Sequence, residues 1–483
     1  MNTPPSKQST VALASVFVLA GVVYALISLV NHYLFKTYAL DLGLYTHAMY
    51  DYIHFRIDDC GMFKPVPQSI LADHFDLYLP LLSPLVLVFG TYTLLIVQIA
   101  AILLGGWGVY KFVGLYYDDT WPPVLAAACF FFSFGIIHAV AFDYHSNVLA
   151  AMMLPWLLYF LKRGKHGLCT LFVVLFVIGK ENMSLWLFFI AIGLMWDYRK
   201  DKKALWHLAA YAVFAIAYFL VINTVVMPKL GGSGGGFARY AHLGDTYADI
   251  ARNLLTHPAD TLRLLFVNTS HLDRYEGVKE EFYYCIFATG LVFTLLKPNY
   301  LFMLVPLIAQ KMLSADGNLW GVSLQYSVEF MPVVVIASFV VFSKLKNRML
   351  RMGIGIALLI SVVLTTFYTI GVPKSTIMVD QLCVYQARHY RQDNFDAAYA
   401  RQLMETIPDD AYVCAASMFV PHLALRTQIE DFSNTKDTQA EFVFITEHYF
   451  NFLNNKILMF GNRDEFETVA TDGNVYLLRR KRP

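Results

Sequence analysis

Long apolar runs separated by short polar turns recur through the first 371 residues. The first extends from Val11 to Phe35 and exceeds the roughly 20 residues that cross a bilayer as a helix. It is too long for a signal-peptide core and lacks a small-residue cleavage pattern, so we expect a transmembrane helix. Further runs lie near residues 92–114, 121–140, 146–161, 167–179, 183–196, 204–227, 282–296, 299–313, 327–343 and 352–371. The pattern predicts an α-helical polytopic membrane protein with about eleven transmembrane helices.

The segment from His74 to Gly90 decides on which side of the membrane each later loop lies. It is apolar enough to cross, but its short length and two prolines, Pro80 and Pro84, are more typical of a juxtamembrane or re-entrant helix. If it does not cross, the loops at 162–165, 199–203 and 344–351, all rich in Lys and Arg, share one side. Short basic loops lie in the cytoplasm. We therefore expect a cytoplasmic N-terminus.

Two long loops lie outside the cytoplasm in this topology. In the first, residues 36–91, an amphipathic helix is expected on the membrane surface, because Leu44, Ala48, Met49, Tyr52 and Phe55 share one helical face. The second, residues 228–280, opens with the glycine-rich segment Gly231–Gly236. That segment lacks the Gly-Lys-Ser/Thr ending of a phosphate-binding P-loop, so we expect a mobile lid or hinge, with a plain linker as the alternative.

The composition turns polar after Gly371, which predicts a transmembrane domain over residues 1–371 and a small extracytoplasmic α/β domain over 372–483. A helix is expected at Asp393–Ile407, and strands at 412–418, 441–446 and 475–479. The tail has no glycine-rich dinucleotide fingerprint and no nucleophile elbow. We therefore expect it to bind or scaffold rather than to catalyse.

Composition supports the membrane interpretation and excludes other classes. With 57% hydrophobic and only 15% charged residues, a soluble fold would expose a large apolar surface. A net charge of +1 argues against nucleic acid as a partner, because tracking phosphates needs a clustered basic excess. The six cysteines lack metal-ligand spacing, which favours buried structural thiols.

Ionisable residues gather beside the predicted external face. Such groups cost about 2.5 to 3.5 kcal/mol at a membrane helix centre, so they often mark a polar cavity or a reaction site. Five clusters qualify: Asp41; His74 with Asp73 and Asp76; Asp143 with His145; Lys180 with Glu181; and Tyr326 with Glu329. Structural alternatives exist: Asp41 could cap the following helix, and His74 could be an interfacial or capping histidine. Lys180 and Glu181 could neutralise one another, and Asp143 and His145 could simply end a helix. Their common side favours one shared external cavity.

The same residues stand in motifs that resemble a known family. Asp41-Leu-Gly-Leu-Tyr45, Ala72-Asp-His-Phe75, Phe142-Asp-Tyr-His145, Gly179-Lys-Glu-Asn182 and Gln325-Tyr-Ser327 resemble, in order, the landmarks of the uncharacterised prokaryotic membrane family called domain of unknown function 2079. In the tail, Ile407–Ala415 and Val420–Leu423 are similar to that family too. The likeness covers nearly the whole chain. Asn182 departs from it, because the family pattern implies a second acid after Lys-Glu.

That family in turn resembles the GT-C superfamily of membrane glycosyltransferases, which includes protein mannosyltransferases and aminoarabinose transferases that use polyprenyl-phosphate sugars. The resemblance implies that Asp41, in the first external loop, is the catalytic group and that a lipid-linked donor lies in the outer leaflet. A carboxylate can take the proton of an acceptor hydroxyl while the anomeric carbon gains cationic character.

The remaining candidates fit binding of the donor phosphate or sugar. Lys180, His74 and His145 could support the leaving phosphate, because cationic and hydrogen-bonding groups are strong in a partly dry cavity. Asp143, Glu181 and Tyr326 could orient those groups or bind the sugar. Asp41 and Asp143 could also hold a divalent metal, Mg or Mn, although the sequence shows no spacing signature for a hard cation.

We therefore expect a glycosyltransferase of the bacterial inner membrane that transfers a sugar from a polyprenyl-phosphate-linked donor to an extracytoplasmic lipid, glycan or protein acceptor. A polytopic transporter or lipid flippase could use the same polar cavity, but it would usually have polar or broken helices at the bilayer midplane. A non-catalytic assembly protein, whose tail recruits partners, is a third hypothesis. It predicts that replacing Asp41 leaves function intact.

Overall fold

The structure is a computed structural model that describes residues 6–57, 62, 69–232, 238–371, 379–433, 438–447 and 465–481. The chain forms two compact units. Unit 1 comprises residues 1–25, 73–76 and 98–382, and unit 2 comprises residues 26–72, 77–97 and 383–483. Unit 2 thus contains parts of the first predicted loop as well as the tail. A domain boundary at residue 371 stays a prediction.

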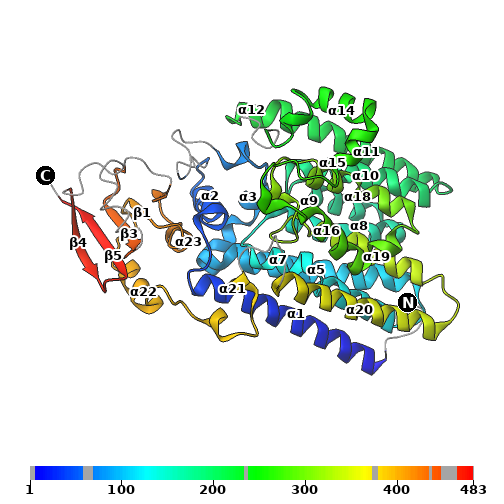
Figure 1. The fold of residues 1–483 in the computed structure, drawn as a ribbon, viewed down its shortest axis with the longest axis horizontal. Coiled ribbons are helices and arrows are strands. Elements are labelled where there is room, and N and C mark those ends of the chain that lie inside the picture. Colours follow the sequence, from blue (N-terminus) through cyan, green and yellow to red (C-terminus); the bar gives the residue numbers. More distant parts are fainter. Residues whose placement is uncertain are drawn as a thin grey trace. The chain divides into compact units, whose positions relative to one another are not determined.

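Unit 1 is built from helices, drawn mainly in cyan, green and yellow in Figure 1. They are the first part of α1 (Lys7–Tyr33), most of α5 (Thr93–Val113), then α6 (Trp121–Phe131), α7 (Phe134–Ala141), α8 (Ser146–Lys162), α9 (His166–Val177), α10 (Glu181–Asp197), α11 (Lys202–Val221), α12 (Met227–Lys229), α14 (Tyr247–Thr256), α15 (Pro258–Leu264), α16 (Val278–Ile286), α17 (Val292–Thr294), α18 (Pro298–Met312), α19 (Phe330–Phe342), α20 (Arg348–Gly371) and α21 (Val379–Leu382). Every predicted apolar run contains a helix.

Four helical stretches in the described part of the chain are long and apolar enough to cross a membrane: Lys7–Tyr33, Tyr78–Tyr116, Lys202–Lys229 and Arg348–Gly371. The pair α6 and α7, bent by 43°, gives a fifth if it forms one span. Helices α8, α9 and α19 are apolar but shorter. At 1.5 Å per residue, the 17 residues of α8 extend about 25 Å, less than a typical hydrocarbon core. Strongly apolar helices are therefore present, and the number of eleven crossings stays a prediction.

Glycine interrupts the predicted run 282–296. Gly290 has a φ of 125°, a backbone conformation that residues with a side chain rarely adopt. The run consequently divides into α16 and α17 with a kink between them. A Cβ at Gly290 would lie 2.7 Å from the Ser338 hydroxyl of α19, so the bare backbone also permits close packing.

The same principle brings α10 close to α18. A Cβ at Gly193 of α10 would lie only 2.7 Å from the carbonyl oxygen of Asn299, and the Trp186 indole N–H donates to the Met303 carbonyl at 3.0 Å. Small residues let helix backbones approach in this way. The two helices are antiparallel. The beginning of α10 lies beside the end of α18, where Asn182 bonds to Gln310, and the end of α10 lies beside the beginning of α18, where Asn299 bonds to Asp197.

Unit 2 contains a five-stranded sheet in the order β2-β1-β3-β5-β4, drawn in orange and red in Figure 1. The strands are β1 (Val413–Ala415), β2 (Ile429–Asp431), β3 (Phe442–Thr446), β4 (Phe466–Thr471) and β5 (Val475–Arg480). β1 pairs in parallel with β2 and β3, and β5 is antiparallel to β3 and β4. The predicted helix is α22 (Ala397–Glu405), and the three predicted strands are β1, β3 and β5. β2, β4 and α23 (Val420–Leu423) were not predicted.

The predicted amphipathic helix is α2 (Leu44–Ile53), also in unit 2. Its apolar positions Leu44, Ala48 and Met49 are buried within this unit, where α2 packs against α3 (Tyr78–Leu82). Of the five predicted apolar positions, only two could meet a membrane surface. Tyr52 is half-buried, and Phe55, which follows the end of the helix, is 99% exposed. The 78–92 segment continues as short helical pieces that include α4 (Val86–Phe89). Most of the predicted lid, residues 233–236, lies outside the described residues.

Replacing Gly193 with alanine should destabilise unit 1, because a backbone oxygen cannot swing away from the added methyl group. We expect a loss of about 1–3 kcal/mol in unfolding free energy, seen as a lower midpoint of thermal unfolding in detergent. Gly353 of α20 is a matched control, since a Cβ there would meet nothing within 4 Å. Gly353→Ala should leave stability unchanged or raise it by up to about 1 kcal/mol. Equal effects of both substitutions would contradict the close approach.

Candidate functional site

In the turn between α9 and α10, Lys180 and Glu181 contact His74, which lies more than 100 residues earlier in the chain. Lys180 Nζ lies 3.1 Å from His74 Nε2, and His74 Nδ1 lies 3.5 Å from Glu181 Oε1. The backbone N–H of Phe75 donates to Glu181 Oε2 at 3.1 Å. Because an ammonium can only donate, Nε2 of His74 accepts and its proton is on Nδ1, facing Glu181. Lys180, His74 and Glu181 are called the cation cluster below.

The cation cluster is partly open and electrostatically paired. The side chains of His74 and Glu181 are 29% and 15% exposed, so a ligand can reach them. Burial by itself would raise the pKa of Glu181, but the interactions with His74 and Lys180 outweigh it and lower the pKa to about 2. Glu181 is therefore ionised at neutral pH. It holds His74, and His74 in turn holds the Lys180 ammonium, which has further N–H donors for a ligand.

Residues 143–147, just before and at the start of α8, form a buried turn. The Gln98 amide donates to the Asp143 carbonyl at 2.6 Å and accepts from the His145 N–H at 2.9 Å. The Tyr144 hydroxyl donates to Asp76 Oδ2 at 3.1 Å. His145 Nδ1 donates to the Phe142 carbonyl at 3.1 Å, and the two rings stack. Asp143 and His145 are only 5% and 4% exposed, so they lie in a packed layer rather than on an open wall.

The same turn leads to a second acid. Asn147 Nδ2 donates to Glu329 Oε1 at 2.6 Å. Glu329 and Tyr326 line a small cavity of about 30 Å³ together with Lys311, whose ammonium donates to the carbonyls of Leu319 and Gly321 at 2.6 and 2.7 Å. A buried lysine held by carbonyl oxygens keeps this loop in one conformation.

The cation cluster and this cavity are neighbours. Asn182 Nδ2, next to Glu181, donates to Oε1 of Gln310, which lines the cavity. The predicted residues His74, Asp143, His145, Lys180, Glu181 and Tyr326 therefore lie on interconnected segments of unit 1. Gln98, Asn147, Gln310 and Lys311 were not singled out from the sequence. Lys311 carries a recognisable signal, a charge within the apolar run 299–313.

Asp41 belongs to unit 2, where it is half-buried in the helical turn Ala39–Gly43. This turn is fixed against α23: the Ala39 N–H donates to the Ser417 hydroxyl at 3.2 Å, and a Cβ at Gly43 would lie 2.8 Å from Val420. The N-cap position of α2 is Gly43, so Asp41 does not hold the capping position that was the alternative for it. Its catalytic role stays a prediction.

Within the described residues, no group of three or more His, Cys, Asp or Glu side chains is arranged to hold a metal ion. Asp41 and Asp143, the pair suggested for Mg or Mn, belong to different units. That suggestion stays a prediction.

The sequence profile of a family described as "Predicted membrane protein (DUF2079)" matches residues 31–456. The chain belongs to the DUF2079 family. This confirms the resemblance drawn from the five motifs. Among curated proteins, no match to this DUF2079 chain is found.

Solved structures of two other proteins are similar to the DUF2079 chain. ArnT from Cupriavidus metallidurans is similar over 97% of both chains, at 10% identity, with TM-scores of 0.49 in the apo state and 0.48 bound to undecaprenyl phosphate. An oligosaccharyltransferase from Archaeoglobus fulgidus, tethered with an acceptor peptide, is similar over 97% of this chain and 74% of its own, at 11% identity and a TM-score of 0.43. At such identity the catalytic residues of those proteins do not transfer to positions here.

Glu181→Gln should reduce stability at neutral pH and lose its effect in acid. Because the folded chain lowers the pKa of Glu181, its ionised form stabilises the fold above the ordinary value of 4.5, and this contribution disappears as pH falls toward about 2. We expect a loss on the order of 2 kcal/mol near pH 7 that shrinks near pH 3, measured by thermal unfolding in detergent. Glu405→Gln, at the exposed end of α22, should show no such pH dependence. A loss that is constant with pH would contradict the pairing.

Proposed function

We propose that this DUF2079 protein is a membrane glycosyltransferase that moves a sugar from a polyprenyl-phosphate-linked donor to a lipid, glycan or protein acceptor outside the cytoplasm. The observation that carries the proposal is the cation cluster, a half-buried ammonium oriented by His74 and Glu181 at the beginning of an apolar helix. A lipid-linked phosphate needs such a cation beside an apolar surface that can accept its chain.

Lys180 is the residue that we assign to the donor phosphate. Its ammonium donates one hydrogen bond to His74, which fixes its direction, and its remaining protons are available to phosphate oxygens. As the bond between the anomeric carbon and the phosphate oxygen breaks, negative charge grows on that oxygen. A preoriented cation stabilises this charge without reorganising. The carboxylate of Glu181 keeps the cation in place.

Asp41 is the proposed general base, an assignment that rests on the GT-C resemblance. Its carboxylate takes the proton of the acceptor hydroxyl, and the acceptor oxygen forms a bond to the anomeric carbon. The electron pair of the broken carbon–oxygen bond leaves with the polyprenyl phosphate. Tyr326 and Glu329, which border the small cavity, are the candidates for binding sugar hydroxyls. We assign the buried Asp143 and His145 to positioning of this wall.

The placement of charge supports a location in the bacterial inner membrane with the cation cluster outside. Helix α10 begins at Glu181 and ends at Asp197, just before the basic loop 199–203. Its 17 residues separate the two ends by about 25 Å. If α10 crosses the membrane and the basic loop is cytoplasmic, the cation cluster faces the opposite side. The same proposed topology has the tail outside.

A transporter or lipid flippase is the second candidate, and the broken helices favour it. The 43° bend between α6 and α7 and the kink at Gly290 resemble the discontinuous helices of transporters. The two functions differ in their products: a transferase forms a new glycosidic bond, whereas a flippase only moves the intact lipid. Product analysis with purified protein therefore separates them.

Asp41→Asn should abolish sugar transfer while leaving donor binding intact. Loss of a general base lowers the rate by about 10²- to 10⁴-fold. The measurement is transfer from radiolabelled polyprenyl-phosphate sugars by purified wild-type and variant protein. Asp245→Asn, which alters an exposed acid in the second loop, should behave as wild type. Transfer that survives Asp41→Asn unchanged would disprove the catalytic assignment, and movement of intact lipid without a new bond would favour the flippase.

Lys180→Met should weaken binding of undecaprenyl phosphate by about tenfold or more, because a charge-assisted hydrogen bond to phosphate is lost. Binding to purified protein in detergent is measured directly, so the result does not depend on knowing the sugar. Lys229→Met, which removes an exposed lysine at the end of α12, is the matched control and should bind normally. Equal binding by the Lys180 variant and wild type would remove the role assigned to the cation cluster.

A further inference from the structure

A second, larger cavity lies at the other ends of the helices that carry the candidate site. It has a volume of about 300 Å³ and is formed by the last turns of α8, α10 and α19, the beginning of α18 and the residues around the end of α5. Helices α8, α10 and α19 also contribute their first turns, or the residues before them, to the candidate site. The two sites are therefore about 25 Å apart, one helix length. No residue of the proposed transferase mechanism lines this cavity.

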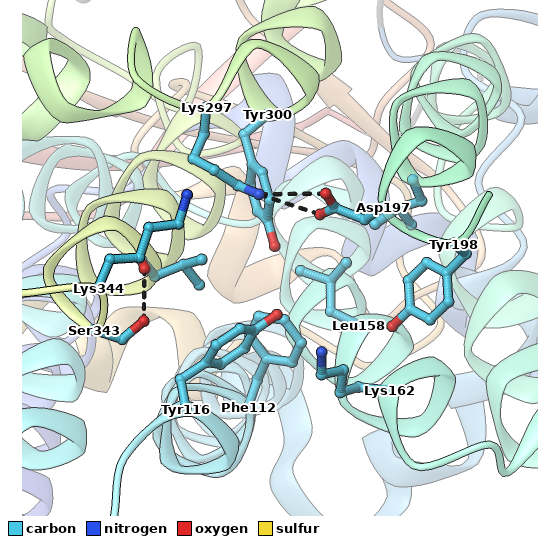
Figure 2. Close-up of a pocket in the computed structure, with 12 residues that line it drawn as sticks. Phe112, Tyr116, Leu158, Lys162, Asp197, Tyr198, Lys297, Tyr300, Ser343 and Lys344 are labelled. Atoms are coloured by element: carbon cyan, nitrogen blue, oxygen red, sulfur yellow. Dashed lines mark hydrogen bonds and ion pairs between the residues drawn. The ribbon is translucent and has the colours of Figure 1, made fainter. Parts of the chain in front are cut away.

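The cavity is positively charged. Lys162, Lys297 and Lys344 are among its twelve lining residues, and Asp197 is the one acid in that set. Figure 2 shows Lys162 and Lys344 on different walls of the cavity. Lys297 Nζ lies 3.3 Å from an Asp197 carboxylate oxygen, so this pair is neutral overall. Two lysines are left without an acid in the lining, and both are exposed enough to meet a ligand.

The other lining residues suit a phosphate with an attached apolar part. Figure 2 shows the hydroxyls of Tyr116, Tyr198 and Tyr300 turned toward the central space. The hydroxyl of the buried Tyr300 is hydrogen-bonded to that of Tyr116, so Tyr116 and Tyr198 are the two that can donate to a ligand. Phe112, Leu158, Leu194 and Val340 form the apolar part of the lining, and each is almost fully buried. The Lys162 ammonium lies 4.9 Å from the centre of the Tyr116 ring, which holds it over the cavity. Asn299 donates to Asp197 at 2.9 Å and steadies the wall that carries Lys297.

Lysines at these positions also have an ordinary explanation. Cations stabilise the C-terminal ends of helices, and Lys162 and Lys344 stand at or after the ends of α8 and α19. Cytoplasmic loops of membrane proteins are generally basic. Neither effect requires a cavity at this position, and neither explains why three tyrosines line the same cavity. Basic pockets between membrane helices on the cytoplasmic side are known to bind acidic lipid headgroups.

We propose that this cavity binds the phosphate group of an anionic ligand, supplied either by the headgroup of an acidic phospholipid or by a free phosphorylated small molecule. Lys162 and Lys344 pair with the phosphate oxygens, and the hydroxyls of Tyr116 and Tyr198 donate to them. The apolar residues contact the part of the ligand next to the phosphate, which is the glycerol in a phospholipid. This binding is independent of the proposed sugar transfer, because it uses different residues at the opposite ends of the helices.

The test compares three probes on the purified full chain in neutral detergent: dioctanoyl phosphatidylglycerol, dioctanoyl phosphatidylcholine and glycerol 3-phosphate. We expect phosphatidylglycerol to bind more tightly than phosphatidylcholine, and Lys162→Gln/Lys344→Gln to weaken that binding by about tenfold. The matched control is Lys165→Gln/Lys346→Gln, which removes two lysines from the same loops that do not line the cavity. It should bind as wild type does.

The two sources are separated by the third probe. Glycerol 3-phosphate that competes as well as the lipid identifies a free phosphorylated ligand, whereas competition by the lipid alone identifies a headgroup site. Lys162→Arg/Lys344→Arg keeps both charges and should keep binding, which separates loss of charge from loss of folding. The proposal fails if the cavity pair and the control pair weaken binding equally, or if neither pair changes it.

Discussion

The contact of His74 with Lys180 and Glu181 is the interaction around which the candidate site is organised. Four residues, Asp73–Asp76, belong to unit 1 although the chain on both sides of them belongs to unit 2. His74 bonds to Lys180, and the backbone N–H of Phe75 donates to Glu181. Asp76 accepts a hydrogen bond from the Tyr144 hydroxyl. Charged groups beside apolar helices are stable only when each is paired or hydrogen-bonded. This short segment supplies the partners that the turn between α9 and α10 requires.

The balance of positive and negative side chains differs between the two ends of the unit 1 helices. At the cation cluster, one lysine faces one glutamate, and a histidine orients both, so the site is nearly neutral and its donors have fixed directions. In the larger cavity, two of three lysines have no acid among the lining residues. The first arrangement suits a reacting phosphate whose charge changes during catalysis, and the second suits stable binding of a permanent anion.

Packing explains why the candidate residues keep their places. Gly193 lets α10 and α18 approach closely, and Asn182 and Gln310 at the adjoining ends of these helices form a hydrogen bond. Lys311 fixes the loop before α19 by binding its carbonyl oxygens, which keeps Tyr326 and Glu329 on the wall of the small cavity. In unit 2, the turn that contains Asp41 is held by Ser417 and Val420 in the same local manner.

The sequence by itself determined the helices, the three main strands of the tail and the family, because apolar runs, alternation and motifs are local properties. It could not locate the kink at Gly290, the short strand β2 or the exposed strand β4, whose patterns carry no strong local signal. The pairing of His74 with Glu181 and of Asn147 with Glu329 was decided by tertiary structure alone. These partners lie more than 100 residues apart in the chain, and only helix packing brings them within hydrogen-bonding or ion-pair distance.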